Sequence, residues 1–283
     1  MIRFLRNKEI DRQKWDATLA CSNQSTLFAQ SWYLDVVSPN WCALVRGDYE
    51  EIFPLPVKNK LGFKYLVQPN FTQQLGLFSC KKKPLPADEW INFIKKKYRR
   101  FDFCLNTQNT IKILEAEPLS NCELPLQDSY ETLKSNYATR VKRNLKKSYK
   151  ADLQQITLEE FIKLKLQNRN GLPSKMYDII PKLYAAFLKN GVQILLVGLR
   201  KDELLAGNLF VIFENRLIGL SGVSSPVGRK HLATFTIIDH LIKKYSSSDM
   251  VLDFKGGKME GTKLFFLGFG AVEKTYFRVS RKF

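Results

Sequence analysis

Three consecutive apolar runs in the second half of the chain decide its fold: VQILLVGLR at 192–200, LLAGNLFVIF at 204–213 and RLIGLSGV at 216–223. Each run has the composition that β-strands favour. Only the short polar segments KDE (201–203) and EN (214–215) separate them. Strand-like runs joined by such short polar connections predict an antiparallel meander.

The residues on either side of this meander predict helices and two further strands. Apolar residues recur at helical spacing at about 158–170 and 176–189, and Gly191 is placed to end the second helix. The elements expected after the meander are a Ser/Pro/Gly loop at 224–229, a helix at about 230–245, a buried strand at 250–254, a short helix at 262–268 and a last strand at 272–279.

The first half of the chain repeats this order of elements without repeating the sequence. The elements expected there are helices at 11–20 and 30–37, strands at 41–46, 50–58 and 63–68, a helix at 87–98, a strand at 101–106 and an extended stretch at 111–117. Such repetition favours two related domains over one large one. We expect an N-terminal domain at 1–128, a connector at 129–151 and a C-terminal domain at 152–283.

The expected connector is an amphipathic helix with a basic stripe. Its apolar face comprises Tyr130, Leu133, Tyr137, Val141 and Leu145. The candidate polyanion-binding residues on the basic side are Arg140, Arg143, Lys146 and Lys147. A solvated helix face is the alternative interpretation, since a charge run on a helix is often no more than that.

Composition describes an ordinary globular protein with an excess of positive charge. Hydrophobic residues make up 45% of the chain, and the formal net charge is +18. A field of this sign attracts nucleic acid, phosphorylated cofactors or an acidic membrane surface, although a merely solvated basic surface is an equal alternative. No apolar stretch approaches the roughly 20 residues of a membrane span, and no signal peptide is visible.

The five cysteines predict free thiols. Their number is odd, and none lie at metal-ligand spacing. They are Cys21, Cys42, Cys80, Cys104 and Cys122. We therefore expect a cytoplasmic protein with reduced thiols rather than a disulfide framework. His231 and His240 are nine residues apart, which forms no metal pair, so no metal is expected.

Four segments carry a family resemblance: GVSSPVGRK at 222–230, LDFKGGKMEGTKLFFLGFGA at 252–271, FAQSW at 28–32 and QQLG at 73–76. With the order of elements, they resemble the GNAT acyltransferase fold and, within it, the FemAB-type aminoacyl and acyl transferases. The resemblance implies an α/β (α+β) chain of two tandem GNAT-like domains. Each domain would be a mixed, mainly antiparallel sheet flanked by helices.

The resemblance places an acyl donor at the loop before the helix at 230–245. A helix start has unpaired N–H groups and partial positive charge, which suits a pyrophosphate. The candidate donor-binding residues are Ser224, Gly228, Arg229 and Lys230. Coenzyme A enzymes of this family have a richer glycine pattern than the Pro226 and single Gly228 found here. The donor is therefore either an acyl-coenzyme A thioester or, as in FemAB-type transferases, aminoacyl-tRNA.

For catalysis, Asp253 is the candidate general base, with a buried structural carboxylate as the alternative. Family members stabilise the oxyanion with a backbone N–H, here at about 221–223. Many use a tyrosine on the last helix, where this chain has Phe266. This difference argues either against a standard coenzyme A mechanism or for substrate-assisted proton transfer. Lys255 is a second candidate to hold an anion. The candidate acceptor-binding residues, expected in a cleft between the domains, are Trp32, Lys58, Tyr65, Gln68, Gln73 and Gln74.

The resulting function is N-acyl or aminoacyl transfer to an amine. The expected acceptor is a small molecule or a peptidoglycan or lipid precursor, with tRNA and peripheral membrane contact as further partners. The competing hypothesis is a non-catalytic RNA-binding or interaction protein on a degenerate GNAT scaffold, motivated by the net charge and the missing tyrosine.

Overall fold

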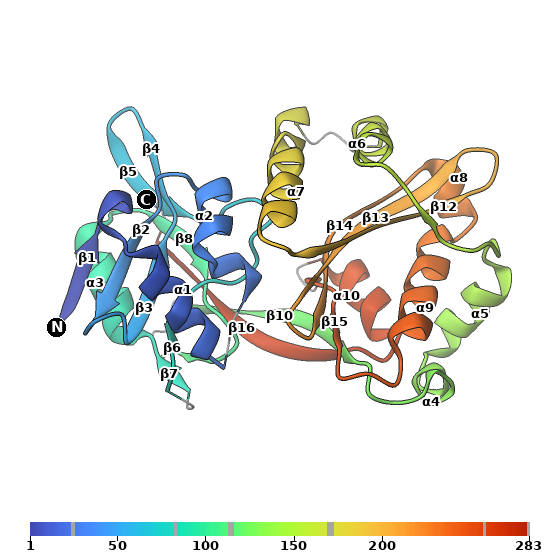
Figure 1. Ribbon diagram of the computed structural model, residues 1–283. Helices are drawn as coiled ribbons and strands as arrows, with labels where there is room; N and C mark the ends of the chain where they lie inside the picture. The colour runs from blue at the N-terminus through green and yellow to red at the C-terminus, as the bar shows by residue number, and fades with distance from the viewer. Residues whose placement is uncertain (24–25, 82–83, 113–115, 169–172, 257–258, 282–283) are drawn as a thin grey trace. The chain divides into compact units, whose positions relative to one another are not determined.

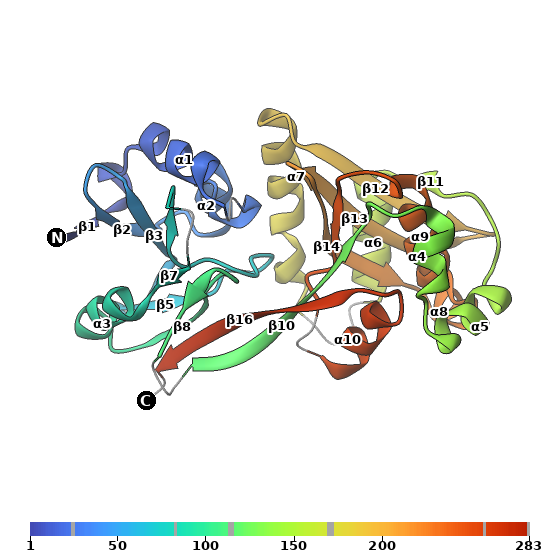
Figure 2. The same cartoon turned by 90° about the horizontal axis from the view of Figure 1, so that it is seen from below.

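A computed structural model describes residues 1–23, 26–81, 84–112, 116–168, 173–256 and 259–281. They form two compact units (Figures 1 and 2). Unit 1 comprises Met1–Leu119 and Thr275–Phe283, and unit 2 comprises Ser120–Lys274. Within the described ranges, no helix is long and apolar enough to cross a membrane.

The predicted meander forms the centre of unit 2. Its strands are β12 (Gln193–Arg200), β13 (Leu204–Phe213) and β14 (Arg216–Ser224), paired antiparallel. The strand expected at 250–254 is β15 (Val251–Asp253), which runs parallel to β14. The two-residue strand β11 (Gln154–Gln155) pairs with the outer edge of β12. The sequence therefore located these strands to within about one residue at each end.

Helices cover both faces of the meander. Figure 1 shows α6 (Leu158–Gln167) on one face and α9 (Ala233–Tyr245) on the other. Because side chains alternate along a strand, neighbouring residues of β13 meet different helices. Gly207 lies against Phe161 of α6, whereas Phe210 belongs to the buried cluster that includes Ile237 of α9. The α9 side is the face on which a pocket opens.

The predicted connector is part of unit 2 and consists of two helices, α4 (Tyr130–Ser135) and α5 (Thr139–Lys147). Its expected apolar residues pack in the core of this unit. Tyr130 and Tyr137 also donate hydrogen bonds to Asp239 of α9. The chain turns between the helices, where the Ala138 N–H donates to the carbonyl of Gly268. The four candidate polyanion-binding residues of α5 are exposed.

The described residues of unit 1 form nine short strands, the start of β10, the end of β16, and three α-helices. One sheet has the order β1-β2-β3-β6: β1 (Ile2–Leu5), β2 (Cys42–Arg46), β3 (Glu51–Leu55) and β6 (Phe78–Ser79). The neighbouring strands β4 (Val57–Lys60), β5 (Phe63–Val67) and β8 (Phe101–Cys104) pair in that order, and β7 (Leu85–Pro86) pairs with β9 (Asn109–Thr110). The helices are α1 (Arg12–Cys21), α2 (Ser31–Val37) and α3 (Asp88–Lys97).

The chain returns to unit 1 at its end, which the sequence did not predict. Strand β16 (Val272–Arg281) pairs antiparallel with β8, with Arg278 opposite Cys104. The Arg278 guanidinium is bound by Asp102 and Glu117. Strand β10 (Ala116–Pro125) leaves unit 1, and its last residues pair with β15. The unit boundaries therefore differ from the expected limits at 128 and 151, because strand pairing between residues far apart in sequence has no local signal.

The expectation of reduced thiols is wrong for two of the cysteines. Cys21 and Cys80 form a disulfide, with Cα atoms 5.0 Å apart. They are 59 residues apart in sequence, and only the packing of α1 near β6 brings them together. Cys42, Cys104 and Cys122 are thiols outside this disulfide.

Candidate functional site

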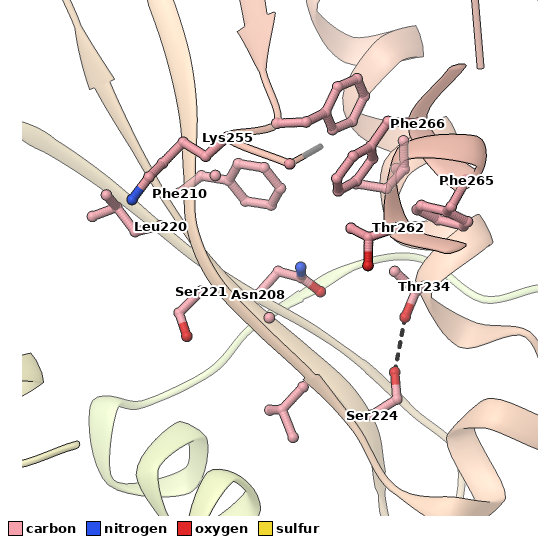
Figure 3. A pocket seen from close by; sticks show the side chains of 16 residues that line it. Asn208, Phe210, Leu220, Ser221, Ser224, Thr234, Lys255, Thr262, Phe265 and Phe266 are labelled. Carbon is pink, nitrogen blue, oxygen red and sulfur yellow. Dashed lines mark hydrogen bonds between the residues drawn. The ribbon is translucent and has the colours of Figure 1, made fainter. Parts of the chain in front are cut away.

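The candidate site of unit 2 lies where two parallel strands separate. Strands β14 and β15 pair only from Arg216 to Ile218, opposite Val251 to Asp253, whereas β14 continues to Ser224. Beyond Ile218, this edge of β14 has no β15 residue to pair with, so its backbone groups need other partners. The Gly222 carbonyl has one, the Lys165 Nζ at 2.7 Å. A pocket of about 530 Å³ occupies this place (Figure 3).

One wall of the pocket is strand and the other is aromatic. The strand wall includes residues 219–224 with Asn208 and Phe210 of β13, and the opposite wall comes from α9 and α10 (Glu260–Leu267). Phe254 and Phe266 stack with ring centroids 4.3 Å apart. Such a combination of apolar walls with a few polar groups is typical of a small-ligand site.

Asn208 is the polar side chain on the floor of the strand wall. It faces Gly222 across the β13–β14 pair, and a Cβ atom at 222 would lie 2.5 Å from the Asn208 Nδ2. The glycine therefore makes room for this amide. Among the described residues, the Asn208 Oδ1 is buried without a hydrogen-bond partner. An acceptor left in this state costs free energy unless a ligand or water binds it.

Lys255 is the one charged residue among the described residues that line the pocket. It is partly buried, and its φ of 52° is unusual for a side-chain-bearing residue. Desolvation lowers the pKa of Lys255 to about 8, although the charge of Asp253 opposes this shift. Figure 3 shows its side chain extending away from Phe265 and Phe266. Its role in holding an anion stays a prediction.

A second pocket, of about 280 Å³, adjoins the first and opens at the start of α9. Both pockets are lined by Thr234, Thr262 and Phe265. No side chain caps α9, whose N-cap residue Leu232 has a φ of 53°. The first N–H groups of this 13-residue helix therefore lie at the second pocket, where the helix dipole places partial positive charge. This is a setting that favours an anion.

The helix expected at 230–245 is α9, and the predicted donor loop before it contains a short helix of its own. The loop 224–229 leads first into α8 (Pro226–Lys230), a helix of five residues. The Ser225 hydroxyl accepts a hydrogen bond from the Gly228 N–H at 2.9 Å, so this helix start is already capped. The N-terminus that opens on a pocket is that of α9.

Gly228 lines the second pocket and also has a packing role. A Cβ atom there would lie 1.9 Å from the carbonyl oxygen of Leu205. The glycine therefore lets α8 pack closely on β13, and its contact with a donor stays a prediction. Ser224 lines the first pocket and shares a hydrogen bond of 2.8 Å with Thr234 (Figure 3).

Two basic donor candidates differ in placement. Arg229 lines the second pocket, where its Nη1 donates to the Ser224 carbonyl at 2.8 Å. Lys230 is exposed and lines neither pocket. The two therefore form a natural pair of test and control.

Asp253 has the structural role that was the alternative in the sequence analysis. It is 6% exposed, and one carboxylate oxygen accepts from the Arg216 guanidinium at 2.8 Å. The other oxygen accepts from the Asn121 amide at 3.1 Å and from the Lys255 N–H at 3.0 Å. Arg216 also pairs with Glu123 at 2.7 Å. With both oxygens engaged and no part in the pocket lining, Asp253 is not placed to act as a general base.

The six acceptor candidates lie in unit 1, and the structure does not gather them into one pocket. The Gln68 Oε1 accepts from the Cys104 N–H at 3.0 Å, and the Gln74 Oε1 accepts from the Thr107 N–H at 3.2 Å. These two amides therefore hold a loop and are not free readers of a ligand. Trp32, Tyr65 and Gln73 are partly buried, and Lys58 lines a separate depression of unit 1.

Sequence reasoning missed Asn208 and Thr262. A signal for Asn208 was present, since it is an amide within the otherwise apolar run at 204–213. In the described parts of the chain, no group of three or more His, Cys, Asp or Glu residues is arranged to hold a metal ion.

Comparison with known proteins places the fold. No family model and no curated protein sequence matches the chain. Among solved structures, FemX superposes with a TM-score of 0.63 at 13% identity, covering 95% of this chain and 96% of that chain. A conserved protein of unknown function from Bacteroides thetaiotaomicron VPI-5482 gives 0.55 at 12% identity, covering all of both chains.

A tandem GNAT protein from the clavulanic acid biosynthesis pathway gives a TM-score of 0.52 at 8% identity, covering 100% of this chain and 99% of that chain. These similarities confirm the predicted fold class, an α/β chain with two tandem GNAT-like domains and a likeness to FemX. At such identities they concern the fold, and the site must be argued from its own residues.

Proposed function

We propose that unit 2 transfers an acyl or aminoacyl group from an activated donor to an amine. The observation that carries this proposal is the pocket beside the open edge of β14, which continues into a second pocket at the uncapped start of α9. An activated carbonyl needs hydrogen-bond donors where negative charge develops, and a phosphate-bearing carrier needs a positive anchor. In this proposal, the first pocket supplies the hydrogen-bond donors and the second supplies the positive anchor.

The acyl carbon lies against residues 219–223 of β14 in this proposal. Backbone N–H groups of the open edge stabilise the oxyanion as the amine attacks, and the two pocket walls align the reactants. The new C–N bond forms as the carbon–sulfur or carbon–oxygen bond to the carrier breaks. The amine proton ends on the departing thiolate or alkoxide, which balances the reaction.

Proton transfer depends on few protein groups. Phe266 has no proton to give, and no carboxylate lines the pocket within the described ranges. Lys255, with a pKa lowered to about 8, is the pocket residue that exchanges a proton near neutral pH. We propose that it either relays the amine proton or balances the charge of the tetrahedral intermediate.

The donor is an acyl-coenzyme A thioester or an aminoacyl-tRNA, and the acceptor is an amine of a small molecule or of a peptidoglycan or lipid precursor. FemX and the tandem GNAT protein share the fold and support transfer chemistry in general. Arg229 and the N–H groups of Ala233 and Thr234 are the proposed contacts for a phosphate of either carrier.

The test is donor binding followed by transfer. The full chain is screened by thermal shift against acyl-coenzyme A thioesters and charged tRNA, and the donor with the largest shift is used with amine acceptors. Arg229→Gln should weaken donor binding about tenfold, because it removes one charge-assisted contact. Lys230→Gln is the matched control and should change binding less than twofold. Equal effects of both variants, or no shift with either class of donor, would refute the proposal.

A second function, RNA binding without catalysis, is favoured by one observation. Arg140, Arg143, Lys146 and Lys147 form an exposed basic surface on α5, which also suits the tRNA part of an aminoacyl donor. Replacing all four by glutamine should abolish binding of RNA or tRNA and leave acyl-coenzyme A binding intact. RNA binding that persists unchanged in this variant would exclude α5 as the surface.

A further inference from the structure

The β4–β5 hairpin of unit 1 has an exposed apolar tip. Lys60 of β4 pairs with Phe63 of β5, and Leu61 and Gly62 form the two-residue turn with φ values of 51° and 81°. Positive φ at both positions is a turn that Asn-Gly would form more readily than Leu-Gly. Leu61 is nevertheless 89% exposed and Phe63 is 78% exposed. Two large apolar side chains therefore lie in solvent, with no packing role inside unit 1.

Lysines surround this tip. The hairpin sequence at 58–64 is KNKLGFK, which places Lys58 and Lys60 before the turn and Lys64 after it. No carboxylate in the described residues pairs with any of the three. Apolar residues at an exposed turn with flanking lysines match the amphipathic pattern of segments that insert at a membrane interface.

A basic depression of about 690 Å³ lies at the base of the same hairpin. Its lining includes Arg6, Lys58, Lys64 and Lys97, and no acidic residue. Burial raises the pKa of the Cys42 thiol, and the positive charges of three of these cations oppose that rise. The three therefore converge around one point of the depression.

Other cations of unit 1 contrast with this cluster. Arg12, Lys14 and Arg46, for example, each pair with a carboxylate. The Lys97 ammonium lies 3.9 Å from the ring centre of Phe4, which is a contact of a different kind. Arg6, Lys64 and Lys97 converge, and Lys58 lines the same depression. None of these four cations pairs with a carboxylate of the described residues, so an external anion would relieve their mutual repulsion.

We propose that the hairpin tip and the basic depression together form a docking surface for an anionic lipid bilayer. Leu61 and Phe63 enter the interface between headgroups and acyl chains, while the four cations bind lipid phosphates. Charge complementarity and the apolar tip together select this partner. A polyanion in solution would bind the cations but leave the apolar tip in water, and a purely apolar partner would leave the cations unpaired. The surface lies wholly in unit 1, so it stands or falls independently of the proposed transfer site.

Vesicle sedimentation tests the proposal with the full chain. Vesicles of phosphatidylcholine alone are compared with vesicles containing 30% phosphatidylglycerol, at about 0.1 M salt. The chain should bind the anionic vesicles at least tenfold more strongly. Leu61→Asn with Phe63→Ser should reduce this binding at least tenfold, and asparagine tolerates the positive φ at 61. The depression variant Arg6→Gln, Lys58→Gln, Lys64→Gln, Lys97→Gln should also reduce vesicle binding at least tenfold.

Matched controls separate a local surface from net charge. The α5 variant Arg140→Gln, Arg143→Gln, Lys146→Gln, Lys147→Gln loses the same number of positive charges as the depression variant. It should retain vesicle binding within about threefold. Leu188→Asn removes another exposed leucine, on α7 (Ile179–Lys189), and should have no effect. Equal losses in the α5 and depression variants would show that net charge alone is responsible.

Insertion has its own readout. Phe63→Trp should show a blue-shifted emission on anionic vesicles and quenching by brominated acyl chains. An unshifted emission would overturn insertion of the tip. Failure of the wild-type chain to bind the anionic vesicles would overturn the proposal. So would a wild-type chain that binds single-stranded RNA but not vesicles, if the Leu61→Asn, Phe63→Ser variant binds the RNA equally well.

Discussion

Replacing Arg216 by methionine tests the ion cluster that holds β14 and β15 together just before they separate. Arg216 is the shared partner of Glu123 and Asp253, at 2.7 Å and 2.8 Å, and both carboxylates are largely buried. Removing one member of a buried ion pair typically costs about 3–5 kcal/mol, because the remaining charge is left without compensation. Asn121 still donates to both carboxylates, so we expect the lower end, about 3 kcal/mol.

The assay is differential scanning calorimetry of the full chain. For a unit of this size, about 3 kcal/mol corresponds to a fall in Tm of roughly 10 °C in the transition of unit 2. A triple variant, Arg216→Met with Glu123→Gln and Asp253→Asn, removes the uncompensated charges and should recover at least half of this loss. A fall below 2 °C in the single variant, or no recovery in the triple variant, would refute the structural role assigned to Asp253.

Three further predictions concern stability. Gly228→Ala should destabilise the chain by about 2 kcal/mol or more in urea unfolding, because α8 must move off β13. Gly261→Ala is the control: a Cβ atom at 261 in α10 has open space around it, so this variant should be neutral or slightly stabilising. The pKa of Lys255 is about 8 in the folded chain against an ordinary 10.5, so the unfolded chain binds more protons between these pH values. The free energy of unfolding should therefore rise by about 1–3 kcal/mol from pH 8 to 10.5. Lys255→Met should flatten that rise when unfolding is measured across this pH range. Reducing the Cys21–Cys80 disulfide should cost about 2–4 kcal/mol. Thiol alkylation under denaturing conditions should count three reactive cysteines without reductant and five with it, and five in both would contradict the bond.

Local patterns were sufficient for most elements and insufficient for their assembly. The run at 204–213 predicted β13 at its observed limits, since apolar composition and polar turns act over a few residues. The run at 50–58 predicted one strand, but the structure has β3 and β4 with Pro56 between them. Proline has no N–H for the ladder and favours such a break.

The parts that the sequence missed depend on distant partners. Residues 278–281 pair with β8 of unit 1, and no local pattern of the last strand indicates this pairing. The candidate site shows the same limit. Residues 224, 228 and 229 of the predicted loop line the two pockets. The packing reason for the glycine, however, is the carbonyl of Leu205 on β13, with the whole of β14 between them in the chain.

The central claim is that an acyl donor binds along the open edge of β14 with its phosphate at the start of α9. Hydrogen–deuterium exchange of the full chain, with and without the donor that gives the largest thermal shift, tests this claim most directly. We predict slower exchange in residues 219–224 and 232–235, with β12 unchanged as an internal reference. Protection that leaves both segments unaffected while the donor is bound would contradict the account.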